Sequence, residues 1–298
     1  MTGHDHSVVV GVDWSDAARA AIEQGAATAA ARRLPLRLVH VLEPTYPLRA
    51  SMGRTHHVDL VLRKAGQRLI EEAVEVLAIA YPELRVVTAV VKGSAVEVLV
   101  DESRTAERIV VGSHGAGIFT ELLVGSTALQ VVSLAACPVV VVPAPLPNDL
   151  PRSGVVVGVD GSPRSQAALA FAFDAADEWD EPLVAVHAWT DPARLAPHEQ
   201  LPVVFDPAMV EHEERLAVAE SMAGYAASHP DVKVDVRVVH HHAVHALSSA
   251  SALARLLVVG SRGRGPVSAL ILGSVSHGVL HHATGPVAVV PSRRAQSG

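Results

Sequence analysis

Two groups of glycine and serine residues recur with identical spacing and could bind phosphate. The first is Gly112-x-x-Gly115, nine further residues and Gly125-Ser126; the second is Gly260-x-x-Gly263, nine residues and Gly273-Ser274. Each group begins where an apolar strand is predicted to end and finishes where a helix is predicted to begin, so free N–H groups would face a glycine-lined approach. Glycine lets the backbone approach ligand oxygens, and the serine hydroxyls can donate to the same phosphates. We predict two phosphate-binding loops; the alternative is that these glycines only shape strand-to-helix turns.

An aspartate stands at the end of the first predicted strand in each half of the chain. Asp13 and Asp160 follow the identical runs Val8 to Val12 and Val155 to Val159. A carboxylate at that place in a doubly wound sheet can accept both hydroxyl groups of a ribose. The alternative role is a helix N-cap, but Ser15 and Ser162 are better placed for it, and we assign the aspartates to a ligand.

The two phosphate loops differ in charge. Arg262 and Arg264 stand in the second loop where the first has His114 and Ala116. Because arginine is a permanent cation that suits phosphate, we predict that the second site binds a triphosphate more tightly than the first. The alternative is that these arginines are solvated or pair with surface acids. Trp14 replaces the small Gly161 beside the aspartate, where it either stacks near a ligand or covers the start of a helix.

Elements of two kinds alternate and must position these residues. Valine-rich runs without polar alternation indicate strands buried on both faces, as in a parallel sheet covered by helices. Stretches rich in Ala, Glu, Arg and Leu favour helices between them. The predicted order in each half is strand then helix, four times, closing on a fifth strand, which makes an open doubly wound sheet. In the first half the strands are expected at 8–12, 36–42, 85–91, 109–111 and 139–142, and the helices at 16–33, 57–81, 95–103 and 126–136.

The chain is a tandem duplication. Val8 to Asp13 returns letter for letter 147 residues later, and the glycine groups return after 148 residues. We expect a first domain at 1–144, a proline-rich linker at 145–153 and a second domain at 154–298. The segment 143–151, which overlaps the linker, carries four prolines, which forbid helix and favour an extended connection.

Composition excludes several classes of protein. The 298 residues carry a formal net charge of −7, which argues against nucleic acid as a main partner. None of the lysines follows glycine, so a Walker A loop cannot occur, and the motifs of dinucleotide enzymes and serine hydrolases are missing. No apolar run is long enough to span a membrane, and with Cys137 alone and no readable leader we expect a soluble, cytoplasmic protein. We expect no metal site at the histidines of 240–245, because neighbouring side chains of an extended segment diverge.

Taken together, Val-Val-Gly-Val-Asp at the start of each half and Gly-x-x-Gly-x9-Gly-Ser later resemble the universal stress protein family in its tandem form, as found in actinobacteria. The resemblance covers essentially the whole chain. It implies two tandem α/β domains of five parallel strands each, Rossmann-like and similar to the adenine nucleotide alpha hydrolases, with ATP at the carboxyl ends of the strands. It also implies pairing of domains along the last strand, so a homodimer or an internal pseudo-dimer is expected.

The resemblance also implies roles for individual residues. Aspartates would hold ribose, backbone atoms at the end of the second strand of each half would meet adenine, and the glycine groups would cradle phosphates, with Mg²⁺ accompanying ATP. The residues so assigned are Val12, Asp13, Val41, Gly112, Gly115, Gly125, Ser126 and Thr127 in the first half, and Val159, Asp160, Ala188, Gly260, Arg262, Gly263, Gly273, Ser274 and Val275 in the second.

These features lead to one expectation and two alternatives. We expect an ATP-binding regulator of a stress response that acts on an unidentified protein partner, because no catalytic acid, base or nucleophile stands out. One alternative is a slow ATP hydrolase or autophosphorylating enzyme, since Ser113, Ser126, Ser261, Ser274 and His114 lie near the predicted phosphates. The other is an adaptor module that binds no nucleotide, although such relatives lack the glycine spacing that both halves retain.

Overall fold

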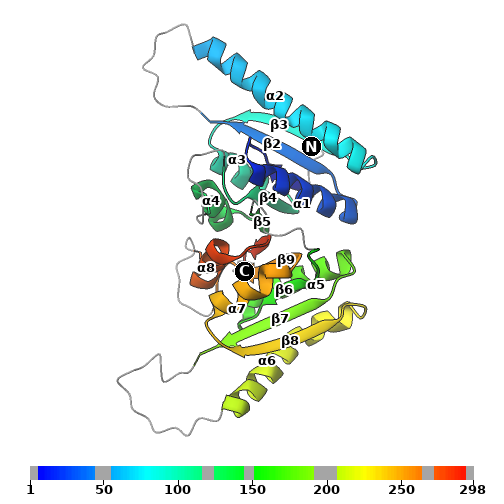
Figure 1. Ribbon diagram of the computed structural model, residues 1–298, viewed down its shortest axis with the longest axis vertical. Coiled ribbons are helices and arrows are strands. Elements are labelled where there is room, and N and C mark those ends of the chain that lie inside the picture. The colour runs from blue at the N-terminus through cyan, green and yellow to red at the C-terminus, as the bar shows by residue number, and fades with distance from the viewer. Residues whose placement is uncertain are drawn as a thin grey trace, which may run out of the picture. The chain divides into compact units, whose positions relative to one another are not determined.

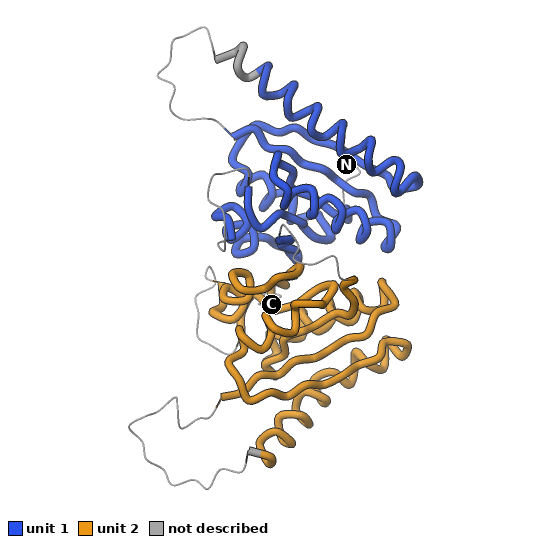
Figure 2. The backbone as a smooth tube through the Cα atoms, viewed as in Figure 1, with its two compact units in different colours: residues 1–146 blue, residues 147–298 orange. Residues whose placement is uncertain are grey.

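The chain divides into two compact units, residues 1–146 and 147–298 (Figure 2). The computed structural model describes residues 6–43, 55–115, 124–143, 151–190, 207–263 and 272–292. Arg264, Ala116 and most of the predicted linker lie outside the described residues. Each unit contains a parallel sheet with helices packed against it (Figure 1).

Strands and helices alternate in both units as the sequence predicts. The first unit consists of β1 Val8–Gly11, α1 Asp16–Arg32, β2 Leu36–Leu42, α2 Thr55–Ala80, β3 Val86–Lys92, α3 Ala95–Glu102, β4 Arg108–Gly112, α4 Ser126–Leu134 and β5 Val139–Val142. The second consists of β6 Val155–Gly158, the 3-10 turn Pro163–Ser165, α5 Gln166–Glu178, β7 Leu183–Trp189, α6 Pro207–Ser228, β8 Val234–His240, α7 Ala243–Ala250, the 3-10 turn Ser251–Leu253, β9 Leu256–Gly260, α8 Ser274–His282 and β10 Val287–Val290. The predicted α/β class is therefore confirmed, with boundaries that differ by one or two residues.

The strand order places the first strand of each unit at the centre of its sheet. The order is β3-β2-β1-β4-β5 in the first unit and β8-β7-β6-β9-β10 in the second. Val8 of β1 pairs in parallel with Leu36 of β2 on one side and with Arg108 of β4 on the other. The chain thus leaves β1 in one direction and returns on its other side, and the connections diverge between β1 and β4. That divergence opens a crevice at the carboxyl ends of these strands.

The central strands are buried on both faces, which explains their unbroken valine runs. Val8 and Val10 are completely buried, as are Val155 and Val157. Right-handed connections put the helices that follow β1 and β2 on one face and those that follow β3 and β4 on the other. Helix α3 accordingly packs with α4, and α7 packs with α8.

Helix α1 lies unusually close to its sheet because its buried side is made of alanine and glycine. Ala21, Ala26 and Ala29 are fully buried, and a Cβ atom on Gly25 would stand only 2.5 Å from Val10 Cγ2. The alanine-rich composition that favours the helix therefore also sets its distance from the strands.

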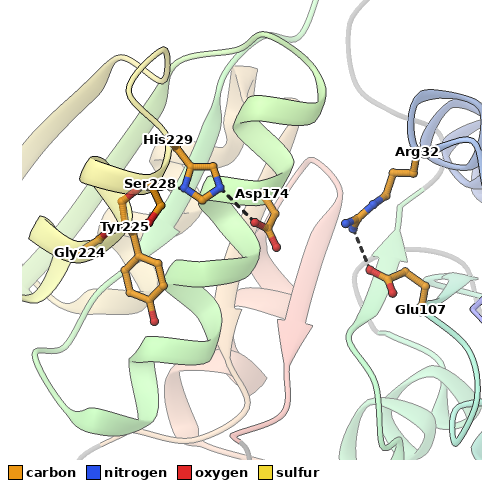
Figure 3. A network of polar contacts seen from close by, with 7 residues as sticks. All are labelled: Arg32, Glu107, Asp174, Gly224, Tyr225, Ser228 and His229. Atoms are coloured by element: carbon orange, nitrogen blue, oxygen red, sulfur yellow. Dashed lines mark hydrogen bonds and ion pairs between the residues drawn. The ribbon is translucent and has the colours of Figure 1, made fainter.

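Polar contacts far from the carboxyl edge fix the ends of two helices. In the first unit Arg32 Nη1, at the end of α1, pairs with Glu107 Oε1 at 2.8 Å (Figure 3). In the second unit His229, just after α6, contacts Asp174 of α5 through Nε2 at 3.2 Å and the Tyr225 carbonyl through Nδ1 at 3.0 Å (Figure 3).

Among the described residues, no helix is long and apolar enough to cross a membrane.

Candidate functional site

The predicted site residues of the first unit gather at the carboxyl ends of β1, β2 and β4. The Val12 N–H donates to the Val39 carbonyl at 2.9 Å, so the segment after β1 stays attached to β2. The Ser113 N–H donates to the Val142 carbonyl at 2.8 Å and holds the segment after β4 beside β5. The two segments that carry Asp13 and the glycine loop are therefore anchored to the sheet on opposite sides of the crevice.

A backbone hydrogen bond joins the two ends of each glycine loop. The Gly125 N–H donates to the Ser113 carbonyl at 2.6 Å, and the Gly273 N–H donates to the Ser261 carbonyl at 2.8 Å. A Cβ atom on Gly125 would lie 3.3 Å from that Ser113 oxygen, so the close approach favours glycine. The sequence spacing thus brings the strand end and the helix start together in both units.

The helices that follow these loops begin without a side-chain cap. Gly125 is the N-cap of α4 and Gly273 is the N-cap of α8, and neither residue has a side chain to accept from the first-turn N–H groups. A helix N-terminus of this kind attracts anions, because its N–H groups and its dipole both favour negative charge. Ser126 and Ser274 are the first residues of the two helices, and both are exposed.

Each predicted ribose aspartate is held by its own turn and faces the glycine loop. Asp13 Oδ1 accepts hydrogen bonds from the N–H and the hydroxyl of Ser15, and Asp160 Oδ1 accepts from the Ser162 N–H at 2.9 Å. The other carboxylate oxygen lies so near the loop that a Cβ atom on Gly115 would stand 3.0 Å from Asp13 Oδ2. In the second unit, a Cβ atom added at Gly263 would stand 2.8 Å from Asp160 Oδ2. The carboxylates are thereby oriented in advance.

The prediction that serines cap the following helices is confirmed in one unit and wrong in the other. The Ser15 hydroxyl accepts from the Ala18 N–H at 3.1 Å and caps α1. Ser162 makes no such bond, because Pro163 follows it and the chain first forms a 3-10 turn before α5 begins at Gln166. Proline has no N–H to donate. Because α5 begins only at Gln166, its first N–H donors also lie farther from Ser162.

A cavity of about 700 Å³ occupies the carboxyl edge of the first unit. All eight residues assigned to the first site line it, as does Trp14. Its wall also includes His40, Glu43, Ala95 and Leu99, which the sequence analysis did not single out. The Glu43 carboxylate accepts from the Ala95 N–H at 3.0 Å and so caps the start of α3 at the wall of the cavity.

The second unit repeats this arrangement with more positive charge. The Val159 N–H donates to the Val186 carbonyl at 3.0 Å, Ala188 lies in β7, and Val275 is the second residue of α8. Arg262 stands two residues after the end of β9, within the glycine loop. Arg164, which the sequence analysis did not single out, donates to the Gly263 carbonyl at 3.0 Å, so its guanidinium group lies against the loop.

A buried histidine contacts the backbone just after the first strand of each unit. His40 Nδ1 lies 2.7 Å from the Val12 carbonyl, and His187 Nδ1 lies 2.7 Å from the Val159 carbonyl. In the second unit the ring also contacts Glu214 Oε2 at 3.0 Å, whereas in the first unit Gly66 packs against the ring and Trp14 meets it edge-on at 4.7 Å. The duplicated Val-His pairs in the sequence were the only available signal for these contacts, which join residues 28 positions apart.

Two other sets of polar residues contain groups that can take part in chemistry. Ser113 Oγ lies 2.7 Å from His114 Nδ1 within the glycine loop of the first unit. The histidines near 240 form ring contacts, such as the stacked pair His241 and His245 at 4.2 Å. Within the described residues, no group of three or more His, Cys, Asp or Glu side chains could hold a metal ion.

Similarity to known proteins agrees with this architecture. The model of the universal stress protein family matches the chain twice, at residues 6–143 and 152–291. A universal stress protein of Mycobacterium tuberculosis is 38% identical over 290 residues, which cover 95% of this chain and 96% of that protein. One from Mycolicibacterium smegmatis is 36% identical over 301 residues and covers 97% and 98% of the two chains. The crystal structure of a universal stress protein from Archaeoglobus fulgidus has a TM-score of 0.67 at 19% identity and covers 97% of both chains, which shows the shared fold.

Proposed function

This chain belongs to the universal stress protein family, and on that premise we propose that it is an ATP-binding regulator with one adenine-nucleotide site in each unit. One observation carries the proposal. In both units a glycine loop closed by a backbone hydrogen bond, an uncapped helix N-terminus and a pre-oriented aspartate meet at the carboxyl edge of the sheet. Phosphate needs the first two of these groups and ribose the third.

The residues present suit an adenine nucleotide. The cavity of about 700 Å³ lies within the range of about 300–1,000 Å³ that is usual for small-molecule sites. We assign the adenine to the backbone of Val12 and Val41, where the side chains of Trp14 and Leu99 form part of the apolar wall. In the second unit Val159 and Ala188 have the matching assignment.

We assign the ribose of the ligand to the aspartates and its phosphates to the glycine loops. Asp13 and Asp160 would accept hydrogen bonds from ribose hydroxyls with the carboxylate oxygen that faces the loop. The glycine loops and the first N–H groups of α4 and α8 would bind the phosphates, and Mg²⁺ would neutralise part of their charge. No residue of the described site is assigned to activating water, so we propose regulation through occupancy rather than turnover.

Fluorescence offers a direct test of the first site. Trp14 is half exposed at the cavity wall, so bound ATP should quench its emission, and the quenching should be lost in Trp14→Phe. The chain has two further tryptophans, and their signal in the variant serves as the internal control. Unchanged fluorescence at saturating ATP, together with no heat of binding in calorimetry, would argue against a nucleotide at this site.

A slow phosphoryl-transfer activity is the second candidate, and the contact between Ser113 Oγ and His114 Nδ1 favours it. A hydroxyl next to an imidazole is the usual arrangement of an activated nucleophile. Phosphate release or protein labelling that disappears in Gly125→Ala would support this activity. Release that is unaffected by this change would be attributed to a contaminating enzyme.

Association and location are further parts of the proposal. We propose that the terminal strands β5 and β10, which are valine-rich, take part in pairing of domains, because unpaired strands of this kind tend to associate. Light scattering after size-exclusion chromatography gives the number of chains. We also propose a cytoplasmic location, which fractionation of cells measures.

A further inference from the structure

The two candidate sites share their backbone but differ in the charged side chains around it. The glycine loops, their closing hydrogen bonds and the aspartates have the same arrangement in both units. Where the first site has Ala17 and His114, the second has Arg164 and Arg262. Where the first has Glu43, the second has Thr190. Each of these exchanges makes the second site more positive.

Among the residues that the structure describes, those that line the first cavity include carboxylates and no permanent cation. Its described wall includes Asp13, Glu43, His40 and His114, and no lysine or arginine is among the described lining residues. The Glu43 side chain is fixed at the wall by its hydrogen bond with the Ala95 N–H. Positive potential there comes from the loop and helix N–H groups alone, apart from any contribution of the imidazoles.

The second site brings guanidinium groups to the glycine loop itself. Arg262 belongs to the loop, and Arg164 Nη1 lies 3.0 Å from the Gly263 oxygen. The sequences of the segments that complete the loops continue the trend: residues 116–123 contain Glu121 and no cation, and residues 264–271 contain Arg264 and no acid. The described side chains of the second site are therefore more positive than those of the first.

A difference in charge between the two sites should favour nucleotides with different numbers of phosphates. A terminal phosphate carries close to two negative charges at neutral pH, and each additional phosphate of the chain adds about one. In a cavity partly shielded from water, carboxylates repel that extra charge and guanidinium groups attract it. The aspartates assigned to ribose accept the same backbone hydrogen bond in both units, so they do not oppose this preference.

We propose that the first unit binds an adenine nucleoside monophosphate and the second unit binds the triphosphate. The inference rests on the proposed function, since it assumes that both units bind adenine nucleotides. One chain would then have two sites that bind different adenine nucleotides.

The test measures each site separately in the full-length chain. Gly273→Asp disables the second site and Gly125→Asp disables the first: aspartate is a favoured N-cap, so the helix is kept, while its carboxylate takes the N–H groups that a phosphate needs. Calorimetry with AMP and with ATP, each with Mg²⁺ and with a chelator, then gives four affinities per site. Circular dichroism of both variants checks that they are folded.

The expected result is a reversal of selectivity between the two variants. With only the first site intact, AMP should bind about tenfold more tightly than ATP, and with only the second intact ATP should bind about tenfold more tightly than AMP. Exchanging the charged residues between the two sites should change the nucleotide preference of each site. Glu43→Thr with His114→Arg should raise ATP affinity at the first site, and Thr190→Glu with Arg262→His should lower it at the second.

The other outcomes separate this inference from the proposed function. If both sites prefer the same nucleotide, or if Mg²⁺ makes the first site prefer ATP, the inference is overturned while nucleotide binding stands. If neither variant nor the unchanged protein binds AMP or ATP, the proposed function fails together with the inference.

Discussion

Single glycines opposite the aspartates set the geometry of the candidate sites. Gly115 and Gly263 leave room for a carboxylate oxygen that would stand 3.0 Å and 2.8 Å from an added Cβ atom. At such short distances, a Cβ atom added at either glycine would force the aspartate side chain or the loop to move. The orientation of Asp13 and Asp160 therefore depends on residues about a hundred positions away in the chain.

Replacing Gly263 by alanine should displace the Asp160 carboxylate and weaken ATP binding at the second site by about tenfold, the effect of losing one good hydrogen bond to a charged group. Calorimetry measures the change, with Gly115→Ala as the matched variant of the first site. Gly224→Ala is the control, because nothing lies within 4 Å of an added Cβ atom there. Equal affinities in Gly263→Ala and Gly224→Ala would contradict the role assigned to Asp160.

Cys137 should be unreactive in the folded protein. Burial raises the pKa of its thiol from 9.0 to about 12, and the thiol hydrogen contacts the Pro138 carbonyl. Because the thiolate is the reactive form, a raised pKa means that labelling at pH 8 is suppressed and increases only near pH 12. A chromogenic disulfide reagent should detect one thiol per chain after denaturation and almost none before it. Rapid labelling of the native protein would show that the thiol is exposed.

At the scale of elements, the valine runs and the alanine-rich stretches predicted the strands and helices of the first unit to within two residues. They did so because each run is buried in a single regular element, where burial and propensity act together. The extended segment expected at 240–245 was wrong in part, because α7 begins at Ala243. The contacts of Glu43 with Ala95 and of Arg164 with Gly263 could not be predicted, since they join residues 52 and 99 positions apart. The cap at Ser162 failed for a local reason, because Pro163 started a 3-10 turn.

Close packing of α1 on β1 gives a prediction for stability. A Cβ atom on Gly25 would stand 2.5 Å from Val10 Cγ2, so Gly25→Ala should force the helix away from the sheet and cost about 1–3 kcal/mol. Thermal unfolding measures the loss. In the control Gly224→Ala, which lies in α6 with open space around it, alanine should instead add about 0.5–1 kcal/mol of helix stability. A Gly25→Ala protein as stable as the parent would mean that α1 does not pack as closely as described.

At the scale of the whole chain, duplication explains why there are two candidate sites and divergence explains why they differ. Both units keep the fold, the glycine spacing and the aspartate, which together support binding of an adenine nucleotide. The charged residues at the rims have changed, from Glu43 and His114 in one unit to Thr190 and Arg262 in the other. The number and identity of bound nucleotides are consequently the properties of the chain that matter most.

The most direct measurement is to denature freshly purified protein in acid and to identify and count the released nucleotides by chromatography and mass spectrometry. Saturated protein should release about two adenine nucleotides per chain, falling towards one in Gly125→Asp and in Gly273→Asp, because each unit is expected to hold its own site. A protein that is purified empty and takes up no added adenine nucleotide would contradict the account and favour an adaptor that works without a ligand.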